Sequence, residues 1–224
     1  MRISYLSQDR IDLAESAKTL ARSMQMPTEA SWQMLKRVGR YLKKYPSKVL
    51  VYVEQQTYNK TRVYVDSDHA GCALTRKSTS GAVAMLGRHP VKHAANLQST
   101  VSLSSGESEF YALVKGGSMG LALHSLFEDW GLELDVELAS DSSAARGHVQ
   151  RRGLGKARHV QSRFLWIQER VGKGDLAISA APGPRNVADI LTKSVGGALL
   201  KKHLETLNIH DRKASINQKT TMRR

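Results

Sequence analysis

The stretch Val63-Tyr64-Val65-Asp66-Ser67-Asp68, residues 63–68, has apolar residues at alternate positions up to an acid, which is typical of a strand. Working outward, β-like runs precede it at 49–53 and follow it at 82–86, 91–97, 136–139 and 176–180. The runs at 63–66, 82–86 and 91–97 are separated by short turns, which suggests an antiparallel meander. The later strands alternate with helical stretches. We therefore predict an α/β fold with a mixed five-stranded sheet and helices on its faces.

Two helices are expected before this sheet, within residues 1–48. The first has an amphipathic stripe that begins at Leu13, and Thr28 is suited to cap the second. The second helix carries a stripe predicted to be buried, formed by Trp32, Leu35, Val38 and Leu42. Its other faces are basic, which indicates either a solvated surface or contact with nucleic acid. Two helices alone make a poor core, so we expect this segment to be the end of something larger.

The balance of charge is strongly basic, with 34 Lys and Arg against 20 Asp and Glu in 224 residues, a net charge of +14. Such an excess favours a polyanionic partner, either nucleic acid or an anionic membrane surface, although a basic solvated surface is the alternative. The sequence contains no run of 18 apolar residues, so we predict no membrane span, and it shows no secretory signal. Cys72 is the single cysteine, which favours a reducing, intracellular compartment.

Four acids in separate segments are candidate metal ligands. Asp66 and Asp141 end predicted strands, whereas Glu109 and Asp189 lie in the first turns of predicted helices. Because functional sites in open sheets lie just beyond strand ends, these four positions could share one rim. Clustered carboxylates repel one another unless cations lie between them. Each acid alone has an ordinary alternative as a turn former or helix-start residue, but the four together predict a site for divalent cations beside a polyanion.

Two of these assignments have a neighbouring acid as an alternative. Ser104 and Glu107 fit a capping box, which would occupy Glu107 with a backbone amide and leave Glu109 free to face the sheet. Asp68 follows Asp66 closely, and we interpret Asp68 as a turn residue after the strand. We therefore select Glu109 and Asp66 as the candidate ligands.

Around these acids the chain resembles a known family, the Pol polyproteins of copia-type retrotransposons. The similar blocks are Tyr64–Gly81, Leu103–Leu113, Asp141–Ala145 and Ala188–Lys193, in the same order along the chain. In the family the first block reads Asp-x-Asp-Trp-Ala-Gly followed by Arg-Lys-Ser-Thr-Ser-Gly, and the second reads Leu-Ser-Ser-x-Glu-Ala-Glu-Tyr-x-Ala-Leu. The third block reads Asp-Asn-x-Ser-Ala, and the fourth reads Ala-Asp-Ile-Leu-Thr-Lys. The first helices are also similar to the end of that family's reverse transcriptase region, but no Tyr-x-Asp-Asp polymerase signature occurs in this chain.

The resemblance implies a ribonuclease H-like domain over 49–200, preceded by a helical remnant of the reverse transcriptase over 1–48 and followed by a basic tail over 201–224. It further implies an endonuclease that cuts the RNA strand of RNA–DNA hybrids. Two Mg²⁺ ions about 4 Å apart, or Mn²⁺ in their place, would be held by the four acids. The implied partners are the RNA–DNA hybrid and the upstream reverse transcriptase of the same polyprotein, with no membrane. The implied ligands, which are also the catalytic residues, are Asp66, Glu109, Asp141 and Asp189.

Two short basic segments are candidates for contact with the nucleic acid. The first is a polar turn with Arg76, Lys77, Ser78 and Thr79, for which a plain hairpin turn is the alternative. The second comprises Lys156, Arg158 and His159. The chain also departs from the family's pattern at other positions, namely Ile11, His69, Ser142 and Arg158–Gln161. The last of these departures loses an acid of the family's pattern, but none removes one of the four candidate ligands, so both a working nuclease and a remnant that binds nucleic acid without cutting it stay open. An integrase-like transferase and a connection piece for a polymerase are further rivals.

Overall fold

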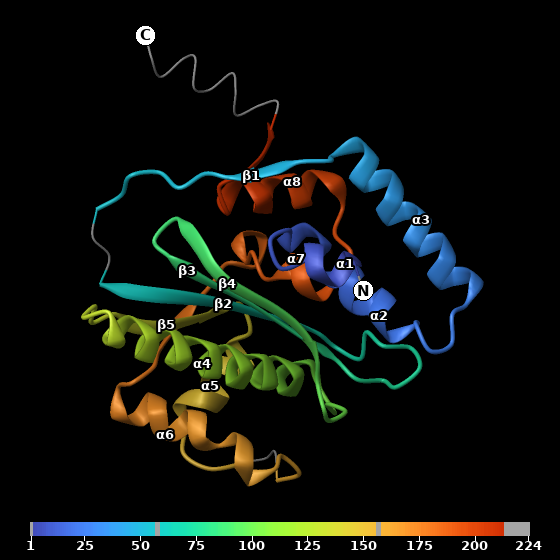
Figure 1. Ribbon diagram of the computed structural model, residues 1–224. Helices are drawn as coiled ribbons and strands as arrows, with labels where there is room; N and C mark the ends of the chain where they lie inside the picture. Colours follow the sequence, from blue (N-terminus) through green and yellow to red (C-terminus); the bar gives the residue numbers. More distant parts are fainter. Residues whose placement is uncertain (1, 57–58, 156–157, 213–224) are drawn as a thin grey trace.

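The structure is a computed structural model that describes residues 2–56, 59–155 and 158–212. A five-stranded sheet lies at its centre (Figure 1). Its strand order is β4-β3-β2-β5-β6. The strands β2, β3 and β4 form an antiparallel meander, whereas β5 and β6 run parallel to β2. The mixed sheet is therefore confirmed, and its strands are β2 (Lys60–Asp68), β3 (Thr79–Leu86), β4 (His89–Leu97), β5 (Asp135–Ser140) and β6 (Ala177–Ala180).

One face of the sheet is covered by α4 (Ser105–Asp129), with α5 (Ser143–Gln150) and α6 (Trp166–Lys173) beside it. Alternation along β2 points Val63 and Val65 into this core, where both are fully buried. Helix α4 lies close to the sheet because Gly116 has no side chain. A Cβ added there would lie 2.3 Å from Val65 Cγ1. Two short 3-10 turns lie at Ser162–Phe164, before α6, and at Gly183–Arg185, between β6 and the next helix.

The opposite face carries α7 (Asp189–Thr192) and α8 (Gly197–Thr206), together with the N-terminal segment. Val83 and Met85 of β3 point into this second core, among the buried side chains of Leu191 and Leu207. Helices thus lie on both faces, as predicted. No helix among the described residues is long and apolar enough to cross a membrane.

The N-terminal segment packs on the second core. It consists of α1 (Arg2–Leu6), a 3-10 turn (Ile11–Leu13), α2 (Ala14–Arg22) and α3 (Glu29–Lys44). Thr28 caps α3 as predicted, since its Oγ1 accepts a hydrogen bond from the Ser31 amide at 3.2 Å. The predicted buried stripe of α3 is only partly correct, because Val38 is buried but Trp32 is 52% exposed. Helix α3 packs mainly on α2, so only one side of it is covered. The origin of residues 1–48 in a polymerase stays a prediction.

The first part of the predicted basic tail, which begins at residue 201, is folded in the structure. Residues 201–206 complete α8, and β7 (Ile209–Asp211) pairs antiparallel with β1 (Lys48–Leu50) in a separate two-stranded sheet. Leu204, Leu207 and Ile209 are buried in the second core, which is why this basic segment folds. The remainder of the predicted tail, 213–224, lies outside the described residues.

Candidate metal-binding site

Three of the four predicted acids converge at one end of the sheet. Asp66 lies near the end of β2, Glu109 in the second turn of α4, and Asp141 directly after β5. One carboxylate oxygen from each lies within 4.8 Å of the others. Because β2 and β5 are parallel neighbours with Tyr64 opposite Ala139, Asp66 and Asp141 emerge at the same edge. The shared rim predicted from the strand ends is present for these three acids.

Glu109 is the member of this cluster whose pKa is strongly raised. Its Oε1 accepts a hydrogen bond from the Ser67 amide at 3.2 Å, whereas its buried Oε2 has no hydrogen-bond partner among the residues described. Burial, together with the negative charges of Asp66 and Asp141, raises the pKa of Glu109 to about 8. A buried acceptor left unpaired beside two other carboxylates fits a cation that the cluster would hold.

The neighbouring Glu107 is fully engaged elsewhere. The Oγ atom of Ser104 accepts a hydrogen bond from the Glu107 amide at 3.2 Å, so the Ser104 half of the predicted capping box is correct, whereas the Glu107 side chain bonds to the amide of Leu103 in place of that of Ser104. The Glu107 carboxylate accepts from the Leu103 amide at 2.9 Å and from the Tyr111 hydroxyl at 2.8 Å, and it pairs with His159 at 2.8 Å. Burial opposes ionisation, but these bonds outweigh it and lower the pKa of Glu107. Glu107 is therefore a structural acid, directed away from the cluster.

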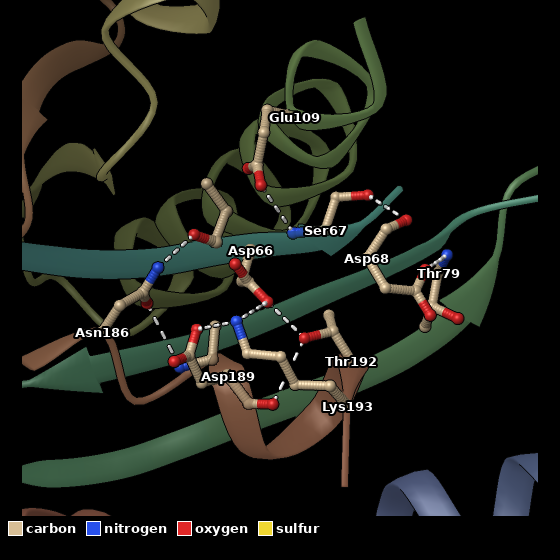
Figure 2. Close-up of polar contacts among 11 residues, drawn as sticks. Asp66, Ser67, Asp68, Thr79, Glu109, Asn186, Asp189, Thr192 and Lys193 are labelled. Carbon is tan, nitrogen blue, oxygen red and sulfur yellow. Dashed lines mark hydrogen bonds and ion pairs between the residues drawn. The ribbon is translucent and has the colours of Figure 1, made fainter. Parts of the chain in front are cut away.

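Asp189 lies beside the cluster and is held there by a lysine (Figure 2). Its Oδ1 is 3.1 Å from Lys193 Nζ, and the same ammonium is 3.8 Å from Asp66 Oδ2. Burial raises the pKa of Asp66, and the nearby Asp189 adds to this rise, although Lys193 acts against it. The group whose oxygens lie within 4.8 Å contains only the other three acids. The structure thus brings the fourth predicted ligand close to Asp66 but pairs it with Lys193.

Asp66 also contacts α7 directly. The Thr192 hydroxyl donates a hydrogen bond to Asp66 Oδ2 (Figure 2). This approach requires Gly81, which lies opposite Asp66 in the register of β2 and β3. A Cβ added at Gly81 would lie 2.8 Å from Thr192 Cγ2 and 3.0 Å from Leu191 Cβ. The missing side chain on β3 therefore lets α7 reach the carboxylate.

The loop before α7 is anchored to the sheet by Asn186, which is fully buried. Its Nδ2 donates to the Val65 carbonyl at 2.8 Å, and its Oδ1 accepts from the Ala188 amide at 3.2 Å. This bridge places Asp189 next to the end of β2. Sequence reasoning assigned no role to Asn186, Thr192 or Lys193. All three flank Asp189 closely, and that proximity was the only available signal.

Asp68 is separate from the metal-ligand cluster. One of its carboxylate oxygens accepts a hydrogen bond from the Thr79 amide, which ties the two ends of the loop between β2 and β3 (Figure 2). The Ser78 hydroxyl, inside the same loop, accepts from the Ala70 amide at 2.9 Å. Asp68 is the last residue of β2 and not, as predicted, a turn residue after the strand, but its carboxylate does hold the start of the turn.

The predicted nucleic-acid contacts are placed unevenly. In the polar turn Arg76 is exposed and Lys77 is partly exposed, but Ser78 and Thr79 are buried and support the turn. Their hydroxyl groups bond within the protein, to the Ala70 amide and to Lys18 Nζ, and their contact with a phosphate stays a prediction. In the second segment Arg158 is exposed and His159 is bound to Glu107, while Lys156 lies outside the described residues.

One departure from the family pattern has a local structural account. Ser142, which stands where the family has Asn, caps α5 by accepting a hydrogen bond from the Ala145 amide at 3.2 Å. Ser and Asn are both strong helix caps, so the exchange preserves the start of the helix after Asp141. The position of Asp141 at the end of β5 is therefore compatible with either residue.

Three carboxylates, two near strand ends of a mixed sheet and one on α4, define a candidate metal-binding α/β protein. Comparison with known proteins places the chain more closely. It is 28% identical over 194 residues to the retrovirus-related Pol polyprotein from transposon RE2 of Arabidopsis thaliana, which covers 85% of this chain and 13% of that protein. It is 27% identical over 188 residues to the corresponding polyprotein from transposon TNT 1-94 of Nicotiana tabacum, which covers 83% of this chain and 14% of that protein.

These relatives confirm the resemblance: the chain is homologous to part of the retrovirus-related Pol polyproteins of copia-type transposons. It spans about one seventh of the length of these curated relatives. No protein-family model matches the chain. Among solved structures it is similar to a ribonuclease H1 isolated from compost, with a TM-score of 0.43 and 17% identity, covering 65% of this chain and 99% of that one.

Proposed function

We propose that this chain is a metal-dependent ribonuclease H that hydrolyses the RNA strand of RNA–DNA hybrids during retrotransposon reverse transcription. The observation that carries the proposal is the cluster of Asp66, Glu109 and Asp141, with oxygens within 4.8 Å and a buried Glu109 oxygen that lacks a hydrogen bond in the described structure. Homology to Pol polyproteins supports the same activity. Because the chain is a small part of those proteins, the upstream reverse transcriptase is a proposed partner.

The residues of the site suit hard cations. Asp66, Glu109 and Asp141 offer carboxylate oxygens only, a donor set that favours Mg²⁺ or Mn²⁺ over zinc. Divalent ions bound there would supply an activated water and stabilise the leaving 3′ oxygen. The protein's own contribution is to fix the three carboxylates on rigid elements, with Ser67 orienting Glu109 and Thr192 orienting Asp66. Asp189 is the proposed fourth ligand.

The charge of the chain suits the proposed substrate. A net charge of +14 favours binding to a polyanion. The negative acids of the site would repel that polyanion locally, so cations are needed there. An RNA–DNA hybrid would be recognised through its shape and 2′-hydroxyl groups, without reading the base sequence. The exposed Arg76 and Arg158 are proposed to contact its phosphates.

The test is cleavage of a labelled RNA–DNA hybrid with Mg²⁺ or with EDTA. We expect the wild-type protein to cut the RNA strand only with Mg²⁺ and the variant Asp141→Asn to leave it intact, since one metal ligand is lost. Asp129→Asn is the matched control, because Asp129 is an exposed acid at the far end of α4 and should cut like the wild type.

A binding-only remnant of the retroelement is the alternative function. It predicts that the wild-type protein binds the hybrid with a steep dependence on salt but leaves the RNA intact at every Mg²⁺ concentration. That result would overturn the catalytic proposal. Equal cleavage by the wild type and by Asp141→Asn would overturn it as well, because the activity would then not depend on the cluster.

A further inference from the structure

Lys193 is a cation placed among the acids of the site. It follows α7 directly, and its Nζ atom forms ion pairs with Asp189 Oδ1 at 3.1 Å and Asp66 Oδ2 at 3.8 Å. Figure 2 shows its side chain extending from the end of α7 toward both carboxylates. The ammonium thus bridges the member of the cluster on β2 and the acid that stands outside it.

The pairing divides the four acids into two sets. Asp66 and Asp189 share the Lys193 ammonium, whereas Glu109 and Asp141 form no ion pair among the described residues. Arg146 is the next cation nearby, but its guanidinium donates to the Ser140 carbonyl at 2.6 Å. One lysine therefore supplies the positive charge on the side of the site that lies between Asp66 and Asp189.

The Lys193 side chain can move away from the two carboxylates and into solvent. It is 51% exposed, although the two carboxylates it pairs with are almost buried. The ammonium is a compact charge on a flexible four-carbon stem, so it can move into solvent without any change of the backbone. A divalent cation and this ammonium would seek the same oxygens of Asp66 and Asp189, and like charges so close repel each other.

We propose that Lys193 is a displaceable internal counter-ion, which occupies the Asp66–Asp189 side of the site in the metal-free protein and must be expelled when divalent metal binds there. It thereby sets the metal concentration at which the site fills. The inference rests on the proposed function only in taking the four acids as the metal site. It deepens that proposal by assigning a role to a residue that is not itself a ligand.

The experiment is a titration with MgCl₂ alone, without nucleic acid, followed by calorimetry and by thermal unfolding. We expect Lys193→Met to bind Mg²⁺ about tenfold more tightly than the wild type, a coupling of ordinary size between two competing ligands. The same variant should unfold at a lower temperature in EDTA and approach the wild type at saturating Mg²⁺. Lys193→Arg keeps the charge and should stay close to the wild-type Mg²⁺ affinity.

Lys201→Met is the matched control. Lys201 is exposed on α8 and pairs only loosely with Glu205, at 3.8 Å, so its removal changes the net charge equally without touching the site. The control should leave the Mg²⁺ affinity unchanged. A merely structural ion pair at Lys193 would instead lower the unfolding temperature of Lys193→Met by the same amount with and without Mg²⁺.

An Mg²⁺ affinity of Lys193→Met equal to or weaker than that of the wild type overturns the proposal. If Lys193→Met is unfolded in both buffers, Lys193→Gln is measured by the same criteria. The outcome is separable from that of the proposed function, because metal binding is read without a substrate. If the protein binds Mg²⁺ as expected but leaves the hybrid intact, the counter-ion proposal stands and only the proposed nuclease activity is overturned.

Discussion

The raised pKa of Glu109 predicts an unusual pH dependence of stability in the metal-free protein. With a pKa of about 8 in the folded state and 4.5 as the ordinary value, Glu109 stays protonated in the native protein while it ionises in the unfolded chain. Its contribution to stability is complete below about pH 4.5, declines as the pH rises, and is lost as the pH passes the folded pKa. The metal-free protein should therefore become less stable from pH 5 to pH 8.

The size of the effect follows from the proton balance. While only the native state holds the proton, the free energy of unfolding falls by about 1.4 kcal/mol for each pH unit. Over three units the loss is about 4 kcal/mol, as an upper bound. For a chain of this length that corresponds to a fall in the unfolding temperature of roughly 8 to 16 °C. Bound Mg²⁺ favours the ionised carboxylate, so saturating metal should flatten the profile.

Thermal unfolding by circular dichroism, in EDTA from pH 5 to pH 8, measures this directly for the wild type and for Glu109→Gln. The neutral amide has no proton to retain, so Glu109→Gln should lose most of the slope and be more stable than the wild type at pH 8. Glu128→Gln is the control, since Glu128 is an exposed acid on the same helix and its removal should leave the slope intact. Equal slopes for the wild type and Glu109→Gln would contradict a raised pKa of Glu109 as the cause.

Two further predictions concern the support of the site and the binding surface. Gly81→Val should destabilise the protein by about 1–3 kcal/mol in urea unfolding, because the added side chain collides with α7. The control Gly39→Ala is at an open position and should not destabilise the protein. Equal stabilities of the two variants would contradict the close approach of α7 to Gly81. Replacing Arg76 and Lys77 together by Ala should reduce the slope of log K against log salt for hybrid binding by about 2, as measured by fluorescence anisotropy. An unchanged slope would show that the turn makes no phosphate contacts.

Local patterns were enough to predict the central elements. The alternation of Val63 and Val65 predicted β2, and the cap at Ser104 placed the start of α4 and turned Glu107 away from the site. The parallel arrangement of strands around a crossover helix then brought Asp66 and Asp141 to one edge. These signals act within a few residues or follow from general rules of sheet topology, so a single sequence carries them.

Contacts between distant segments were not predictable in the same way. β1 pairs with β7 across some 160 residues, and no pattern in either three-residue strand specifies the other. Trp32 has the spacing of a buried residue but is exposed, because burial depends on which neighbour covers a helix face. Periodicity predicts that an apolar face exists, and only packing decides whether it is covered.

The order of the central strands and helices, the four candidate acids and the similarity to retrotransposon Pol polyproteins can all be read from the sequence alone. The tertiary structure decided how those acids are used. In the packed structure one carboxylate oxygen from each of Asp66, Glu109 and Asp141 lies within 4.8 Å of the others, and Asp189 forms an ion pair with Lys193. The physical reason is that ionisation and ion pairing depend on burial and on distances of a few ångströms, which arise only when β2, α4 and α7 have packed together.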